Sequence, residues 1–243
     1  MIDNNTATSL NQIYNGDCLE IMKAIPNESI DLIITDPPYR TTSRGDNGSS
    51  GGMLKSTIAK QGKMFSYNDI KPTEYLSEFY RVLKDGTHCY VMTNNKNLLD
   101  ICNTAIGCGF KFIKTLIWDK GNKVMGTHYM SQYEYIVFLR KGKSKNINSC
   151  GTSDILKVPN KKMKSPDGKN VHNTEKPVEL MEILVENSSQ AGDIVLDPFA
   201  GIGSTCIACK KLSRNFIGME IDKMFCDVAR QRLEATSNEQ YRL

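Results

Sequence analysis

The sequence predicts an α/β protein with a doubly wound, mostly parallel sheet that also contains an antiparallel hairpin. Three observations support this fold class. Short apolar runs typical of buried strands alternate with segments of helical spacing along most of the chain. Two of these runs are followed directly by an aspartate and a proline, at Asp36 and at Asp197. The second turn then continues into glycines and the start of a helix. Both turns follow the carboxyl end of a strand, which is where open α/β sheets bind their ligands.

Length and composition are those of one soluble globular domain spanning residues 1–243. The chain is 40% hydrophobic and 24% charged, and no apolar run approaches membrane-spanning length. The eight cysteines follow no framework spacing, which is typical of reduced thiols. One close pair, Cys206 and Cys209, has no second pair or histidine near it, so we expect no metal site. The amino terminus resembles no export signal, and we expect a cytoplasmic protein.

The first half of the chain is expected to contain three strands and three helices. The run 30–35 is β-branched and stops at two prolines, as a buried strand does. Residues 72–83 place Leu76, Phe79 and Leu83 on one helical face. The expected strands are 12–15, 30–35 and 88–92, and the expected helices are 19–25, 72–83 and 96–106. Lys84 to Gly86 are expected to close the second helix.

Residues 40–66 have almost no apolar periodicity. They are rich in Gly, Ser and Thr and directly follow the first Asp-Pro turn. A long loop without secondary structure in a compact domain is usually functional or disordered. We therefore expect a mobile loop that closes over or grips a substrate.

The second half of the chain is expected to add a hairpin and two further strand–helix units. The strands 112–118 and 133–139 are joined without an intervening helix, which favours a hairpin at the edge of the sheet. The remaining expected strands are 193–197 and 215–220, and the expected helices are 177–185, 204–212 and 223–233.

Positive charge is concentrated between residues 119 and 176. This stretch holds 12 Lys or Arg against 5 Asp or Glu, whereas the whole chain carries a formal net charge of only +4. Within it, residues 141–170 have little hydrophobic pattern and are expected to form a loop or small subdomain outside the main sheet. Such a basic segment suggests a polyanionic partner. A solvated, flexible loop is the alternative, and charge alone does not exclude it.

The first turn, Asp36-Pro37-Pro38-Tyr39, combines groups that could hold a planar base. Asp36 supplies a carboxylate acceptor, and the two prolines fix the direction of the carbonyl groups. Tyr39 supplies a flat ring with one polar atom. Together these groups suit a base that carries an exocyclic amine. A proline-rich turn after a core strand is the alternative.

The second turn suggests a cofactor that carries no phosphate. Its glycines allow close approach of a ligand, and Ser204 and Thr205 can cap the helix that follows. Glu220 ends the next strand, where an acid suits a ribose. The third glycine of a dinucleotide fingerprint would fall at Cys206, and Asp197 would repel a pyrophosphate. A carboxylate at this place is better matched to S-adenosylmethionine, which has a sulfonium, an amino group and a ribose.

Taken together, the motifs resemble the β-class amino-methyltransferases of DNA, and among these the adenine-N6 methyltransferases. In that class the Asp-Pro-Pro-Tyr tetrad precedes the glycine motif. The resemblance rests on six stretches: Asn15–Cys18, Asp36–Tyr39, Leu116–Lys120, His172–Pro177, Asp197–Thr205 and Glu220. It implies a Rossmann-like methyltransferase fold, S-adenosylmethionine as the cofactor and duplex DNA as the substrate. Residues 141–170 match no motif, as expected of a target-recognition insert.

The resemblance also implies roles for individual residues. The catalytic set is Asp36, Pro37, Pro38 and Tyr39. Asp17 and the Cys18 backbone would hold the cofactor's adenine, and Glu220 its ribose. The complete cofactor set is Asp17, Cys18, Asp36, His172, Thr174, Lys176, Asp197, Phe199, Ala200, Gly201, Gly203, Ser204, Thr205, Glu220 and Ile221. The lysines expected to contact DNA phosphates are Lys161, Lys162 and Lys164.

Simpler roles remain open for some of these residues. Phe199 could pack in the core, Thr174 could cap a helix, and Lys176 could be a surface charge. In the implied reaction, Asp36 and a proline carbonyl accept the hydrogens of an adenine amine, and the flipped base stacks on Tyr39. No Pro-Cys pair occurs, so a cytosine-C5 mechanism is not expected.

Several other functions remain as alternatives. A cytosine-N4 methyltransferase of the same fold usually carries Ser at the first tetrad position, so Asp36 favours adenine. Protein-glutamine or RNA methyltransferases and a non-catalytic DNA-binding module are further alternatives. Because the recognition region is small, we expect either a short DNA target site or help from a second subunit, such as a homodimer partner.

Overall fold

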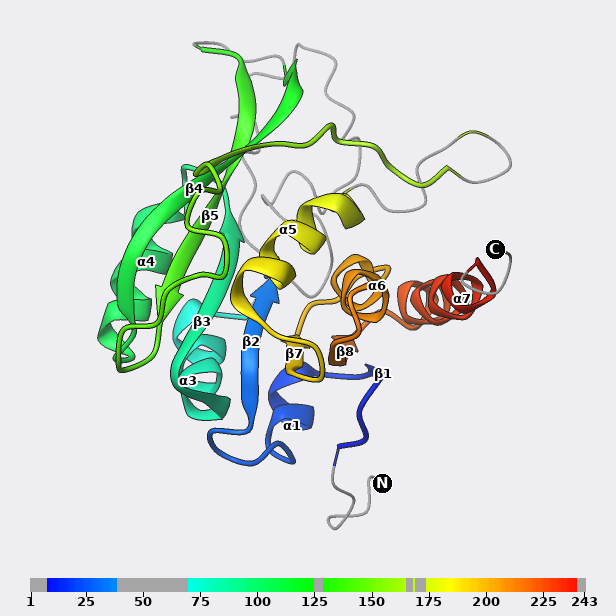
Figure 1. The fold of residues 1–243 in the computed structure, drawn as a ribbon, viewed down its shortest axis with the longest axis horizontal. Helices are drawn as coiled ribbons and strands as arrows, with labels where there is room; N and C mark the ends of the chain where they lie inside the picture. The colour runs from blue at the N-terminus through cyan, green and yellow to red at the C-terminus, as the bar shows by residue number, and fades with distance from the viewer. Residues whose placement is uncertain (1–7, 39–69, 125–128, 165–167, 169–173, 240–243) are drawn as a thin grey trace, which may run out of the picture.

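Eight strands of the described chain form one mixed sheet in the order β1-β8-β7-β2-β3-β5-β4-β6 (Figure 1). The computed structural model describes residues 8–38, 70–124, 129–164, 168 and 174–239. The predictions for Tyr39, His172 and the 40–66 loop lie outside these residues. The strands are β1 (Gln12–Asn15), β2 (Ile30–Thr35), β3 (Leu83–Thr93), β4 (Lys111–Val124), β5 (Ser131–Arg140), β6 (Ile155–Lys157), β7 (Ile194–Asp197) and β8 (Asn215–Glu220).

The predicted fold class is confirmed. β1, β8, β7, β2 and β3 are parallel neighbours, and β5 is antiparallel to both β3 and β4. Short apolar strands joined through helices produce this arrangement, because a parallel connection needs a crossover. No helix among the described residues is long and apolar enough to cross a membrane.

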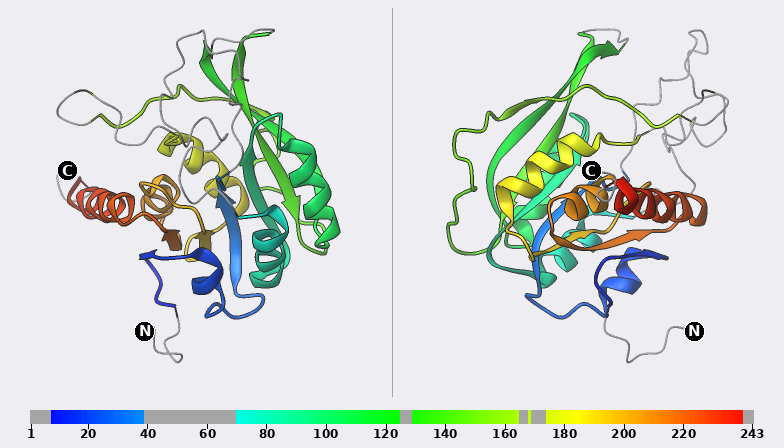
Figure 2. Two further views of the ribbon diagram at one scale, coloured as in Figure 1. Left: turned by 180° about the vertical axis from the view of Figure 1, so that it is seen from behind. Right: turned by 45° about the vertical axis from the view of Figure 1, so that its right-hand side comes forward.

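Helices cover both faces of the sheet (Figures 1 and 2). One face carries α1 (Cys18–Met22), α3 (Pro72–Val82) and α4 (Leu98–Gly107), and the other carries α5 (Val178–Ser188), α6 (Ser204–Lys211) and α7 (Lys223–Glu239). The alternation of side chains along β2 shows why. Leu32 and Ile34 belong to the core under α5 and α6, whereas Ile33 belongs to the core under α1 and α3. All three side chains are fully buried.

The hairpin of β4 and β5 is confirmed, but its place at the edge of the sheet is not. β6 pairs in parallel with the outer side of β4, so part of the 141–170 stretch belongs to the main sheet. One buried side chain, Leu156, and a hydrogen bond from the Trp118 indole to the Val158 carbonyl (2.8 Å) fix this strand. A three-residue strand with one inward side chain is too short to give a periodic signal.

A second correction concerns the end of α3. Lys84 to Gly86 do not close the helix, because β3 begins at Leu83, directly after Val82. Leu83 is aligned with Ile30 of β2, and the Gly86 amide donates to the Lys141 carbonyl (2.9 Å). Leu83 and Gly86 thus meet backbone partners that are distant in the sequence, which a helix-end pattern could not indicate.

Candidate active site

The carboxyl ends of four adjacent parallel strands bring the predicted site residues to one edge of the sheet. Asp17, Glu220, Asp197 and Asp36 end or follow β1, β8, β7 and β2, which are neighbours in that order. The register places Asn15 beside Glu220, so the strand ends are level at this edge. Ligands of open α/β sheets bind at this edge.

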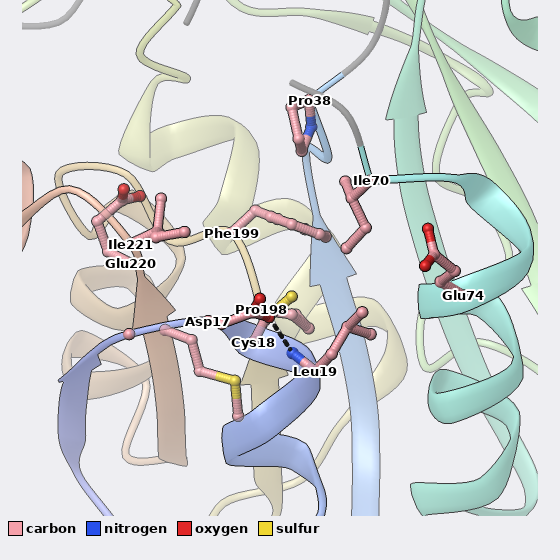
Figure 3. A pocket seen from close by; sticks show the side chains of 12 residues that line it. Asp17, Cys18, Leu19, Pro38, Ile70, Glu74, Pro198, Phe199, Glu220 and Ile221 are labelled. Atoms are coloured by element: carbon pink, nitrogen blue, oxygen red, sulfur yellow. Dashed lines mark hydrogen bonds between the residues drawn. The ribbon is translucent and has the colours of Figure 1, made fainter. Parts of the chain in front are cut away.

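A cavity of about 330 Å³ opens at this edge (Figure 3). Five predicted cofactor residues line it: Asp17, Cys18, Phe199, Glu220 and Ile221. The predicted catalytic residue Pro38 reaches the same cavity. The cavity therefore extends from the β1 and β8 ends to the turn that follows β2.

Sequence reasoning missed seven residues of the lining or gave them another role. These are Gly16, Leu19, Pro38, Ile70, Glu74, Pro198 and Met219. Glu74 lies in the first turn of α3, where its carboxylate accepts from the Lys71 amide (2.7 Å). Only the tertiary placement of α3 brings it to the cavity, so its own sequence neighbourhood carried no signal beyond an acidic first turn.

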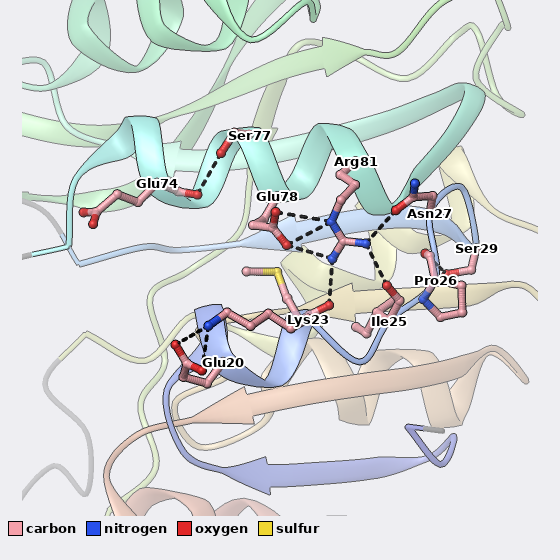
Figure 4. Close-up of polar contacts among 11 residues, drawn as sticks. Glu20, Lys23, Ile25, Pro26, Asn27, Ser29, Glu74, Ser77, Glu78 and Arg81 are labelled. Carbon is pink, nitrogen blue, oxygen red and sulfur yellow. Dashed lines mark hydrogen bonds and ion pairs between the residues drawn. The ribbon is translucent and has the colours of Figure 1, made fainter. Parts of the chain in front are cut away.

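Arg81 fixes that placement of α3 (Figure 4). Its guanidinium donates to the carbonyls of Met22 and Ile25, each at 2.8 Å, and pairs with Glu78 at 2.7 Å. The fork of donors thus ties α3 to the end of α1 and to the segment that leads into β2. Both helices supply side chains to the cavity, so this tie shapes it.

The side chains of Asp17 and Glu220 bind the backbone around the cavity. Asp17 caps α1 by accepting from the Leu19 amide (2.8 Å). Glu220 accepts from the Gly201 amide (2.9 Å) and the Asp222 amide (2.8 Å). Burial raises the pKa of Glu220, and these two backbone donors oppose the rise. Glu220 therefore connects the end of β8 to the glycine turn.

Gly203 is required by packing. Its φ of 83° lies in the left-handed region, which favours glycine. A Cβ added there would lie 3.0 Å from the Ala229 Cβ and 3.3 Å from Ile13 Cδ1. A side chain at this position would point between α7 and β1, and the predicted place of Gly203 at the cofactor stays a prediction.

Asp197 is buried and holds the second turn together. Its carboxylate accepts from the Thr35 hydroxyl (2.8 Å) and the Phe199 amide (3.2 Å). Burial raises the pKa of Asp197 to about 6, while bonds from Thr205, Thr35 and Phe199 lower it. Asp197 does not line the cavity as described. Thr35 directly precedes the first turn, so this one hydrogen bond joins the two predicted motifs.

Asp36 has one carboxylate oxygen in use and one free among the described residues. Oδ2 contacts the Lys176 ammonium, whereas Oδ1 is buried and has no hydrogen-bond partner in the described part of the chain. Burial raises the pKa of Asp36, Lys176 opposes the rise and Glu134 adds to it. A buried acceptor without a donor is costly, so Oδ1 is suited to receive a donor from a ligand.

Lys176 lies beside the turn that carries Asp36. Besides Asp36, its ammonium faces Glu134 of β5 at 3.5 Å and the Thr174 carbonyl at 3.2 Å. Glu134 in turn pairs with Lys120 of β4 at 2.9 Å. Lys176 is not in the described cavity lining, and its predicted place near the cofactor's carboxylate stays a prediction. Sequence reasoning missed Glu134. The one feature of the sequence that could have indicated it is a charged residue between two tyrosines in a strand.

The other predicted residues fall into two groups. Ala200, Ser204 and Thr205 are buried in the glycine turn and the start of α6 and do not line the described cavity. Of the three predicted DNA-contacting lysines, Lys161 and Lys164 are exposed and Lys162 is half-buried.

The residues present fit S-adenosylmethionine. Three carboxylates line the cavity, from Asp17, Glu74 and Glu220, and its described lining contains no Lys or Arg. Apolar side chains such as Leu19 and Phe199 offer surfaces for a purine ring. An acidic cavity favours a ligand with a sulfonium and an ammonium over one with phosphates. An acidic cavity at the carboxyl ends of parallel strands is the kind of site that a methyltransferase using S-adenosylmethionine requires.

The chain belongs to the DNA methylase family, whose sequence profile matches residues 30–231. The resemblance predicted from the motifs is thereby confirmed. The type II methyltransferase M.HinfI of Haemophilus influenzae is 32% identical over 255 residues, which cover 96% of this chain and 71% of that protein. The crystal structure of the M1.HpyAVI–SAM complex is 26% identical, with a TM-score of 0.66, and the match covers 91% of this chain and 99% of that one.

A cytosine-N4-specific enzyme shares the same fold. The PvuII DNA methyltransferase structure matches with a TM-score of 0.71 over 96% of this chain and 93% of that one, at 16% identity. This likeness shows the fold alone. The architecture therefore does not choose between target bases, and the choice depends on the residues of the site.

Proposed function

We propose that this protein transfers a methyl group from S-adenosylmethionine to the N6 amine of adenine in duplex DNA. The observation that carries the proposal is the state of Asp36. Its buried Oδ1 has no partner among the described residues, and it belongs to a turn whose Pro38 lines the candidate cofactor cavity. A free acceptor in a turn that borders the candidate cofactor cavity supports transfer of a methyl group to an amine bound there.

Asp36 and the Pro37 carbonyl would act as acceptors for the two hydrogens of the amine. The lone pair of adenine N6 is shared with the ring, which makes it a poor nucleophile. Holding both hydrogens lets the nitrogen become more tetrahedral and directs its lone pair at the methyl group. S-adenosylmethionine, when bound, would supply an activated methyl group on a sulfonium. As the nitrogen–carbon bond forms, the methyl–sulfur bond would break, S-adenosylhomocysteine would leave, and one amine proton would be released to water. The protein contributes position and electrostatic stabilisation.

The target base must leave the helix to reach this turn, because N6 is inaccessible inside a duplex. Flipping costs a few kcal/mol in lost stacking and pairing. Tyr39 is proposed to recover part of this by stacking on the base. Lys161, Lys162 and Lys164 are proposed to contact phosphates and to hold the duplex during the exchange.

A cysteine nucleophile has no support in this site. Cys18 is the cysteine in the cavity lining, and burial together with Asp17 raises its pKa to about 12. A thiol with such a pKa is protonated at neutral pH and is a weak nucleophile. Direct attack by the amine, without a covalent enzyme intermediate, is therefore proposed.

Cytosine-N4 methylation is the second candidate, since its exocyclic amine poses the same chemical problem. Asp36 argues for adenine, because enzymes of this class that act on cytosine usually carry Ser at that place. The test uses unmethylated duplex DNA, S-adenosylmethionine and mass spectrometry of the digested nucleosides. N6-methyladenine is expected with the wild-type chain and not with Asp36→Ala. N4-methylcytosine as the sole product would overturn the proposal.

A further inference from the structure

Four charged side chains of alternating sign form a chain that ends at Asp36. Lys120 of β4 pairs with Glu134 of β5 at 2.9 Å, and Glu134 faces Lys176 at 3.5 Å. Lys176 contacts Asp36 Oδ2. The four side chains come from four places in the sequence, and none is more than 22% exposed. We call this set the charge chain.

Burial favours the protonated form of Asp36, and the charge chain can oppose this effect. A carboxylate removed from water tends to take up a proton, and the resulting acid could not use that oxygen as an acceptor. Burial is the largest influence on the pKa of Asp36 and raises it, whereas Lys176 is the largest influence in the opposite direction. The ammonium also occupies Oδ2 and leaves Oδ1 for the amine.

Other charged or titratable groups near Asp36 do not replace Lys176. Glu134, Asp197 and Tyr75 are acids, and a negative charge on any of them would oppose ionisation of Asp36. Lys120 is a cation, but it affects the Asp36 pKa less than Lys176 and Glu134 do, and it is paired with Glu134. Lys162 lies near Lys176, and burial and that ammonium lower its pKa.

Glu134 and Lys120 act on Lys176 rather than on the substrate. A lysine side chain has many rotamers, so a fixed partner is needed to hold its ammonium at one oxygen. Although burial raises the pKa of Glu134, Lys176 and Lys120 together hold it below its ordinary value. Glu134 is therefore ionised and can anchor Lys176, and the β4–β5 pairing sets its position, since Trp118 lies opposite it.

We propose that Lys176 is a positioning residue that keeps Asp36 ionised with Oδ1 free, and that Glu134 and Lys120 hold Lys176 in place. The inference rests on the proposed function, in which Asp36 accepts a hydrogen of the target amine. It gives Lys176 a role at the target base, in place of one at the cofactor's carboxylate.

The first experiment measures single-turnover methylation between pH 6 and 9 at saturating DNA and cofactor, together with cofactor affinity by calorimetry. Lys176→Met is expected to lower the rate at pH 7 by about 100-fold. The loss should shrink by about tenfold per pH unit above 7, because the rate follows the ionised fraction of Asp36. Lys176→Arg keeps the charge and should restore most of the rate at pH 7.

Two further variants sharpen the assignment. Glu134→Gln is expected to lower the rate by about tenfold and to move the pH profile less than Lys176→Met does. The ammonium is kept but held less firmly, and the loss of the Glu134 charge favours ionised Asp36. Lys211→Met is the matched control, because Lys211 pairs with Glu182 (2.8 Å) on α5, outside the charge chain. It should behave as the wild type.

Two outcomes would overturn the inference. One is a Lys176→Met variant whose pH profile matches the wild type. The other is a variant whose main defect is a cofactor affinity weakened more than about tenfold, which would place Lys176 at the cofactor.

Carbon-13 titration of the labelled Asp36 carboxyl, assigned with Asp36→Asn, separates this inference from the proposed function. It needs no methyl transfer. We expect a higher Asp36 pKa in Lys176→Met than in the wild type. An unchanged pKa would reject the inference even if adenine is methylated, and absence of adenine methylation would reject the proposed function alone.

Discussion

The candidate cofactor cavity and the turn with Asp36 that we propose to be catalytic lie side by side but are built differently. The carboxylates of Asp17 and Glu220 accept from backbone amides of the turns around them. Asp36 instead depends on one side-chain cation, brought from a segment 140 residues away in the sequence. Backbone donors remain when a neighbouring side chain is replaced, whereas a side-chain cation is lost with one substitution. The cavity should therefore be robust and the catalytic turn sensitive.

Replacing Asp36 by Ala should give the largest loss of methyl transfer. A small loss would contradict the view that this turn is the more sensitive of the two regions. We expect methyl transfer to fall by at least about 10³-fold, because the acceptor for the amine is lost. Cofactor affinity should stay within about threefold, since the cavity walls are unchanged. Labelled methyl transfer and calorimetry measure the two quantities. Activity within tenfold of the wild type would contradict the assignment.

Gly203→Val tests the packing that supports the cavity. The left-handed backbone and the close contacts with Ala229 and Ile13 should cost about 2–4 kcal/mol of the free energy of unfolding. Denaturant unfolding measures this loss. Cofactor affinity of the folded fraction should change little. A stable variant that no longer binds the cofactor would show that Gly203 is part of the ligand site.

Glu220→Gln tests whether the cavity still binds the cofactor after one of its charged side chains is made neutral. The amide keeps one acceptor oxygen for the Gly201 or Asp222 amide but loses the charge and the second acceptor. Cofactor affinity should fall by about tenfold, which corresponds to one weakened charged hydrogen bond. Calorimetry measures the affinity, and circular dichroism checks the fold. A loss of methyl transfer at saturating cofactor would instead place Glu220 in the chemistry.

Thr35→Val tests the hydrogen bond between the two regions. The pKa of Asp197 is about 6 in the folded protein, above about 3.9 in an unfolded chain, so the folded state binds the proton more tightly. The free energy of unfolding should therefore fall as pH rises between about 4 and 6. Removing the Thr35 donor should raise this pKa and extend the fall to higher pH. Denaturant titrations at several pH values measure it, and Asp197→Asn should lack this contribution.

The basic segment should give the smallest effect. Lys161→Ala and Lys164→Ala remove exposed charges, and each lost phosphate contact should lower the slope of log affinity against log salt by about one unit. The methylated sequence should stay the same. Fluorescence anisotropy with duplexes at several salt concentrations measures the slope. A changed target sequence would show that these lysines read bases.

The site residues differ in whether their positions could be predicted from the sequence. Asp17, Phe199 and Glu220 could be placed from sequence because each ends or follows a strand in a local motif. Glu134 and Glu74 could not, since only the packing of β5 and α3 brings them to the site. The alternation of strands and helices predicted the fold, but the three residues of β6 were too few to reveal that the sheet continues beyond β4.

The short strand β6 also bears on how the DNA specificity of this protein could be redesigned. Val158 is held by the Trp118 indole, and the Met163 amide donates to Glu175, which pairs with Arg232 at 3.0 Å. Val158 and Glu175, which flank residues 159–174, are thus both held by contacts with other parts of the protein. A graft of a relative's segment between Val158 and Glu175 would leave the sheet and the glycine turn in place. It would also have to reproduce the Met163 amide bond to Glu175 and the Thr174 carbonyl contact with Lys176. We propose that exchanging this interval between relatives changes the target sequence, as expected if residues 141–170 form the target-recognition insert.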